Sequence, residues 1–111
     1  MPKFLTIGYG DEQDYEATDP KVRGQAHAHD AWLVEQGAVM GIAGAPVQVR
    51  NTDGKGVTHE GGSFLRSDLP VAGFALIEAA SVEDAIDLVA KTPCAVARGV
   101  VEVWPLLNEP P

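Results

Sequence analysis

Three histidines are the side chains of this sequence best suited to proton transfer near neutral pH. His29 recurs at helical spacing with Ala26 and Leu33, which aims its imidazole at the interior of the molecule. We therefore predict that His29 is the main catalytic candidate and that it lines whatever pocket exists. His27, two residues earlier in the same segment, is the second catalytic candidate, and His59 is a candidate ligand contact.

Each histidine also has a purely structural interpretation. For His29 the alternative is an imidazole at the edge of the core, satisfied by one hydrogen bond. His27 falls beside Arg23 and Asp30 on the helical wheel, which is equally typical of a solvated position. For His59 the alternative is an exposed residue of a hairpin.

A glycine-rich stretch at residues 61–64 offers a second kind of site. Its backbone N–H groups are typical of an anion-binding nest, and the stretch is also placed to act as a lid. It lacks the lysine and the following helix of a phosphate-binding loop, so a plain turn is the alternative. The predicted ligand-binding residues are His59, Gly62, Ser63 and Phe64, together with Gly41, whose missing side chain leaves room beside a thin strand.

No metal and no other cofactor is predicted. Structural zinc needs Cys and His ligands at characteristic spacing, and the sequence has a single cysteine and no such set. That residue, Cys94, follows Pro93 near a helix end, where a thiol is not activated, so we interpret it as a packing residue. A single cysteine also fits a reducing compartment, and we predict a cytoplasmic protein.

The composition is that of one globular domain, residues 1–111, with 45% hydrophobic and 22% charged residues. Sixteen acidic against eight basic residues give a formal charge of −8, which repels nucleic acid. No apolar run approaches the roughly 20 residues that a membrane-spanning helix needs. We therefore predict neither nucleic acid nor a membrane as a partner. Five acids lie within residues 11–19, which we interpret as a solvated loop.

The predicted elements follow one another as strand, helix, strand, hairpin, strand, helix, strand. Asp19 before Pro20 marks the start of the first helix, and Gly37 marks its end. Ser81 caps the second helix, which Pro93 stops. The strands are predicted at residues 3–9, 38–43, 71–78 and 100–104, with a hairpin excursion at 45–64 and a tail at 107–111.

This order predicts an α+β fold of the ferredoxin-like, split βαβ type. Such a fold has an antiparallel sheet of four strands with both helices on one face. The apolar run at residues 71–78 predicts a central strand. The opposite face of the sheet is also rich in apolar residues, so we expect a second copy of the chain to cover it in a two-fold homodimer.

Several stretches resemble the YCII-related family, in particular its DGPF-domain branch. The resemblance implies a dimeric α/β-barrel built from two ferredoxin-like subunits, with one YCII-like domain in this chain. It extends over nearly the whole sequence and is carried by Tyr9-Gly10-Asp11-Glu12, by residues 37–41, by residues 72–81, and by Gly99-Val100-Val101-Glu102-Val103-Trp104-Pro105-Leu106.

The chain departs from the family pattern at two places. Where the family has Asp-Gly-Pro-Phe, residues 61–64 read Gly-Gly-Ser-Phe, and its Asp-Pro after the second helix is here Thr92-Pro93. The resemblance also implies a His–Asp site whose histidine lies on the first helix. That position falls near Ala26, close to His27 and His29, and Thr92 leaves the pair without its aspartate.

Two functional hypotheses remain open from the sequence. The first is a small-molecule enzyme of lyase or isomerase type, in which a histidine moves a proton in a cleft between the first helix and the sheet. The second is a non-catalytic, homodimeric ligand-binding or regulatory interaction module. A pocket that brings together an imidazole and a carboxylate would favour the enzyme.

Overall fold

Four strands form one antiparallel sheet in the computed structural model, which describes residues 1–107. They are β1 (Lys3–Tyr9), β2 (Val39–Ile42), β5 (Val71–Glu78) and β6 (Val100–Leu106), in the order β2-β5-β1-β6. Every neighbouring pair is antiparallel. The predicted strands at 3–9 and 71–78 are confirmed, and β5 is central as expected. The last strand continues to Leu106, and residues 108–111 of the predicted tail lie outside the described residues.

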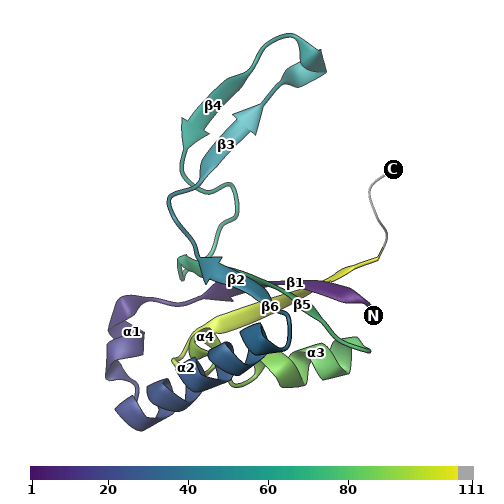
Figure 1. Ribbon diagram of the computed structural model, residues 1–111. Helices are drawn as coiled ribbons and strands as arrows, with labels where there is room; N and C mark the ends of the chain where they lie inside the picture. Colours follow the sequence, from purple (N-terminus) through teal and green to yellow (C-terminus); the bar gives the residue numbers. More distant parts are fainter. Residues whose placement is uncertain (108–111) are drawn as a thin grey trace.

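The helices lie together on one side of this sheet (Figure 1), so the molecule is an α+β protein of two layers. They are α1 (Glu12–Ala17), α2 (Pro20–Glu35), α3 (Val82–Val89) and α4 (Pro93–Val96). The predicted caps are confirmed: the Asp19 side chain accepts from the Lys21 N–H, and the Ser81 side chain accepts from the Asp84 N–H. Within residues 1–107 we find no helix with the length and apolar character to cross a membrane.

Two of the helices were not predicted. Residues 11–19 were expected to form a solvated loop, but α1 occupies most of them because the Asp11 carboxylate accepts from the Asp14 N–H at 2.7 Å and caps the first turn. The second predicted helix ends at Val89, before the predicted stop at Thr92-Pro93. The same proline then opens α4, because the first position of a helix needs no N–H donor.

The core lies between the sheet and α3. Its buried members are Phe4, Ile77, Ala79, Ala85 and Val89. The opposite face of the sheet carries the cross-strand partners of Leu5 and Ile7. These partners include Phe74 and Trp104, and half of the Trp104 side chain is exposed (50%). The described chain therefore has one covered and one uncovered sheet face.

The predicted excursion at residues 45–64 is a hairpin that stands apart from the sheet (Figure 1). Its strands are β3 (Val47–Arg50) and β4 (Thr58–Gly61), joined through the 3-10 turn η1 (Thr52–Gly54). The Gly62 N–H donates to the Pro46 carbonyl at 3.1 Å, which closes the base of the hairpin. We call residues 45–64 the arm.

Candidate functional site

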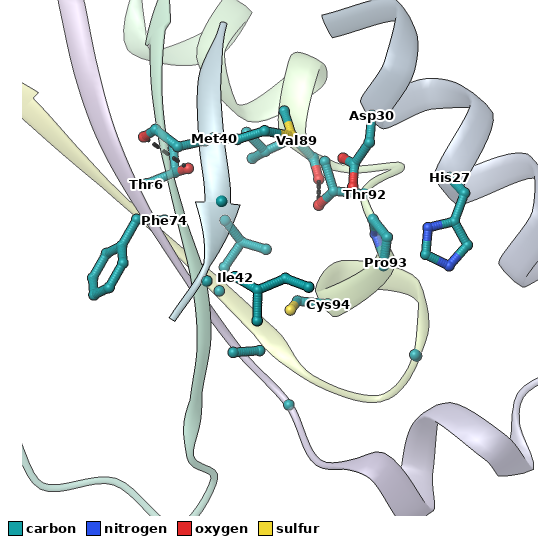
Figure 2. Close-up of a pocket in the computed structure, with 18 of the residues that line it drawn as sticks. Thr6, His27, Asp30, Met40, Ile42, Phe74, Val89, Thr92, Pro93 and Cys94 are labelled. Atoms are coloured by element: carbon teal, nitrogen blue, oxygen red, sulfur yellow. Dashed lines mark hydrogen bonds between the residues drawn. The ribbon is translucent and has the colours of Figure 1, made fainter. Parts of the chain in front are cut away.

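A cavity of about 470 Å³ lies between the sheet and the helices. This volume is within the range of about 300–1,000 Å³ that is usual for small-molecule sites. The wall is mostly apolar, with a few polar side chains from the helical side (Figure 2). Those that matter for chemistry are Asp11, Glu12, Tyr15, His27, Asp30, Thr92 and Cys94.

Small residues of the sheet leave the space for this cavity. Gly8 of β1 and Gly73 and Ala75 of β5 line it, where larger side chains would fill it. A Cβ atom on Gly73 would lie 2.6 Å from the Gly41 carbonyl oxygen, so this glycine is also required for the close approach of β2 to β5. Gly41 also borders the cavity, but it pairs with Phe74, so its missing side chain leaves room on the uncovered face of the sheet.

His27 and Asp30 lie one turn apart on α2 and both line the cavity (Figure 2). Tyr15 of α1 holds the imidazole: its hydroxyl oxygen is 2.5 Å from Nε2 of His27, and the two rings meet edge to face with centroids 5.8 Å apart. The guanidinium of Arg23 lies 5.1 Å from the centre of the Tyr15 ring. The unpredicted helix α1 is therefore the element that positions His27.

The half-buried carboxyl of Asp30 is electrostatically unusual. Burial raises the pKa of Asp30 above its ordinary value, whereas positive charge on His27 and His29 acts in the opposite direction. Burial also raises the pKa of the Cys94 thiol, and the negative charge of Asp30 raises it further. Cys94 is therefore a thiol at neutral pH and a poor nucleophile.

His29 does not line the cavity, so the prediction that it would is wrong. Its Nε2 lies 2.6 Å from the Leu88 carbonyl oxygen of α3, and its ring stacks on Trp32 with centroids 5.6 Å apart. Ala26 and Leu33 are the residues of α2 that face the sheet. His29 flanks this pair on the side of α3, and His27 flanks it on the side of the cavity. Periodicity placed both histidines near the buried stripe but did not show which neighbour lay on each side.

The arm residues predicted as ligand contacts lie away from this cavity. His59 is exposed on β4, and Gly62, Ser63 and Phe64 border a separate hollow of about 350 Å³ beside β3. The Ser63 hydroxyl donates its proton to the Leu65 carbonyl at 2.9 Å, so this donor is used within its own loop. The structure therefore does not bring these four residues together with His27, and their role in binding stays a prediction.

Sequence reasoning missed three polar contributors to the cavity. Tyr15 lay in the acidic run, where no periodicity marked it, and Asp30 was noted only as a neighbour of His27. Thr92 lines the cavity, where its hydroxyl donates to the Val89 carbonyl at 2.7 Å. Figure 2 shows the Asp30 side chain directed from α2 toward this threonine. Asp30 is therefore the carboxyl that α2 contributes to the cavity, beside His27.

The chain matches no model of a known protein family and no curated protein. Within residues 1–107, no three Cys, His, Asp or Glu side chains are grouped so that they could hold a metal ion. The inference about chemistry therefore rests on the groups that line the cavity. These include an imidazole and a carboxyl, one turn apart on α2, beside an apolar volume.

Proposed function

We propose that the helix–sheet cavity binds a small, neutral and largely apolar molecule, and that His27 and Asp30 exchange protons with it in a reaction of lyase or isomerase type. One observation carries the proposal. An imidazole and a half-buried carboxyl, one turn apart on α2, line the same apolar cavity. Paired groups with different proton affinities are the usual basis of acid–base catalysis.

The two groups have different roles. When Nε2 of His27 donates its proton to the Tyr15 hydroxyl oxygen, the neutral imidazole keeps its lone pair on Nδ1, where it is free to take a proton, so α1 sets the tautomer of the base. Asp30 keeps its proton to higher pH than an ordinary carboxyl, because burial raises its pKa. We assign His27 as the base that removes a proton, and Asp30, beside it on α2, as the second group of the exchange.

The charge around the cavity limits the ligand. Asp11, Glu12 and Asp30 line it, and the whole chain carries a formal charge of −8. An anionic ligand would be repelled by this field. A neutral molecule with one exchangeable proton fits the cavity best.

The same proposal includes the family and its assembly. The strand order β2-β5-β1-β6 and the helices on one side support a ferredoxin-like arrangement, and the sequence resemblance supports membership of the YCII-related group. In the homodimer the uncovered faces of two sheets pack together. The exposed side chains of Val39 (70%) and Trp104 support this, since soluble monomers rarely expose large apolar patches.

A second candidate is a ligand-binding module without catalysis. The observation that favours it is Thr92, which replaces the aspartate of the family pattern and whose hydroxyl already donates to Val89. In that case the cavity binds the same class of neutral molecule, and His27 serves only to orient it.

Binding is tested with N-phenyl-1-naphthylamine, a neutral fluorescent probe that reports apolar sites. We expect saturable fluorescence that Ala75→Leu abolishes, because the larger side chain fills the cavity floor. Ala28→Leu makes the same change on an exposed position of α2 and is the control. Equal binding by both variants would contradict a site in this cavity.

Proton transfer is tested with 5-nitrobenzisoxazole, a neutral carbon acid. A base removes the ring C–H proton while the N–O bond breaks, which yields a coloured cyanophenolate. We expect His27→Gln to lower the rate by roughly a hundredfold, as is usual for loss of a general base. His29→Gln and His59→Gln are the controls and keep the wild-type rate. Equal rates in all variants that still bind the naphthylamine would favour the binding module.

A further inference from the structure

We infer that the arm docks on a second copy of this chain and clamps the dimer. The inference rests on the proposed homodimer and goes beyond it by assigning a partner and a contact surface to residues 45–64. The bare side of the arm, defined by Val47, Val49, Val57 and His59, is the surface that meets the partner.

The arm has no adequate support within its own chain. Among the described elements, β3 and β4 make their extensive contacts only with each other. An isolated two-stranded hairpin is at best marginally stable in water. The radius of gyration of the chain is 15.9 Å, against about 13 Å for a compact chain of this length. The arm is the segment that extends the molecule (Figure 1).

The two faces of the arm differ in chemistry. On one face Arg50 pairs with Glu60 at 3.4 Å, and its Nη2 donates to Gln48 at 3.1 Å. On the other face Val47 and Val49 are 62% and 66% exposed. His59 pairs with Val49, so it shares that face. Val57, which precedes β4, is also 65% exposed. One face is thus satisfied by its own polar contacts, and the other is an apolar surface without a cover.

The exposed area of the chain is larger than that of a compact monomer of the same mass. The chain exposes 7929 Å², whereas a compact monomer of its mass exposes about 5,900 Å². The excess is roughly 2,000 Å², and a stable interface of standard size buries about 800 Å² on each partner. The uncovered sheet face and the arm together therefore supply more than enough surface for a permanent dimer.

The direction of the arm identifies the second copy as its occupant. The arm rises on the side of the sheet opposite the helices (Figure 1). A partner sheet packed on that face lies about 10 Å away. The arm then stands beside the partner, with its length available to extend along it.

Charge agrees with this occupant. The arm contains two basic residues, Arg50 and Lys55, and two acidic residues, Asp53 and Glu60. The rest of the chain has six basic and fourteen acidic residues. Two such acidic bodies repel each other. The electrically balanced arm is the part of one chain that an acidic second copy does not repel.

The experiment compares two double variants of the full chain by sedimentation equilibrium. Val47→Glu with Val49→Glu changes the bare side, and Gln48→Glu with Thr58→Glu adds the same charge to the polar face. All four positions lie on the arm, outside the core. We expect the first pair to raise the dissociation constant of the dimer by roughly a hundredfold, and the control pair to change it by less than about threefold.

A photo-crosslinking residue at position 49 gives the second measurement. We expect it to yield covalent dimer, whereas the same residue at position 58 yields little. Trp104→Glu places a charge on the uncovered sheet face, so it tests the sheet-to-sheet contact of the dimer independently of the arm. If Trp104→Glu dissociates the dimer but the valine variants do not, and position 49 gives no covalent dimer, the clamp is overturned and the dimer stands. A wild-type chain that is monomeric at micromolar concentration overturns both the clamp and the homodimer. The binding and proton-transfer tests of the cavity do not depend on that result.

Discussion

Nε2 of His29 donates its proton to the main-chain oxygen of Leu88 at 2.6 Å, so a side chain of α2 satisfies a carbonyl in the last turn of α3. Carbonyls in that turn have no partner within their own helix. His27, two residues earlier, lines the cavity instead. The two histidines therefore have separate roles, one joining the two helices and the other facing a ligand volume.

We predict that His29→Ala lowers the free energy of unfolding by about 1–2 kcal/mol, because the Leu88 carbonyl loses its donor and Trp32 loses its stacking partner. Urea unfolding measures this change. Binding of the naphthylamine and the rate of benzisoxazole opening are expected to stay at wild-type values. A variant as stable as wild type, or one that loses the proton-transfer activity while folded, would contradict this separation of roles.

The elements of this fold follow well from the sequence because their signals are local. The strands at 3–9 and 71–78 and the caps at Asp19 and Ser81 depend on neighbouring residues, and they were predicted correctly. The helix α1 was missed because its stability comes from a single cap, Asp11, within a run whose charge suggested a loop.

The site was predicted less well because it depends on long-range packing. Tyr15 and His27 are twelve residues apart, and nothing in their spacing shows that α1 folds back on α2. The choice between His27 and His29 also required knowing that α3 packs on one side of α2 and that the cavity lies on the other. Gly41 borders the cavity, but its pairing with Phe74 puts its missing side chain on the uncovered face, which strand periodicity alone did not show.

We predict that Asp30→Asn makes the protein more stable at pH 7. Burial raises the pKa of Asp30, so the folded state binds its proton more readily than the unfolded state does. The stability associated with this proton is complete below the ordinary carboxyl pKa and is lost as the pH rises through the raised value. The asparagine variant avoids that loss. Thermal unfolding should show the two proteins converging at acidic pH, and the benzisoxazole rate of the variant should fall.

We predict that Tyr9 ionises late and limits stability in alkali. Its hydroxyl donates to Oε1 of Glu102 at 2.5 Å; this hydrogen bond, with burial and the charge of Glu102, raises the pKa of Tyr9 from 10.0 to about 12. The unfolded chain therefore loses the proton first, and stability declines from about pH 10 until the folded group has titrated near pH 12. Phenolate absorbance, with Tyr9→Phe as the reference, measures the titration. A Tyr9 that ionises together with exposed tyrosine would contradict the hydrogen bond.

The contact between Gly8 and Cys94 gives a test of packing at the cavity floor. A Cβ atom on Gly8 would lie 2.8 Å from Sγ and 3.3 Å from Cβ of Cys94, which is too close for either atom to stay in place. We predict that Gly8→Ala lowers the free energy of unfolding by about 1–3 kcal/mol, as is usual for overpacking. Gly10→Ala is the control, because its Cβ would lie at an ordinary 3.8 Å from the same sulfur.

The double variant Gly8→Ala with Cys94→Ala distinguishes this clash from other effects of the substitution. Removing the sulfur removes the closest contact, so the double variant should be more stable than the sum of the two single changes by about 1 kcal/mol. The 3.3 Å approach to the remaining Cβ of residue 94 should keep the rescue incomplete. Additive losses in urea unfolding would show that Gly8→Ala acts on the backbone of β1, and that Cys94 does not determine the glycine at this position.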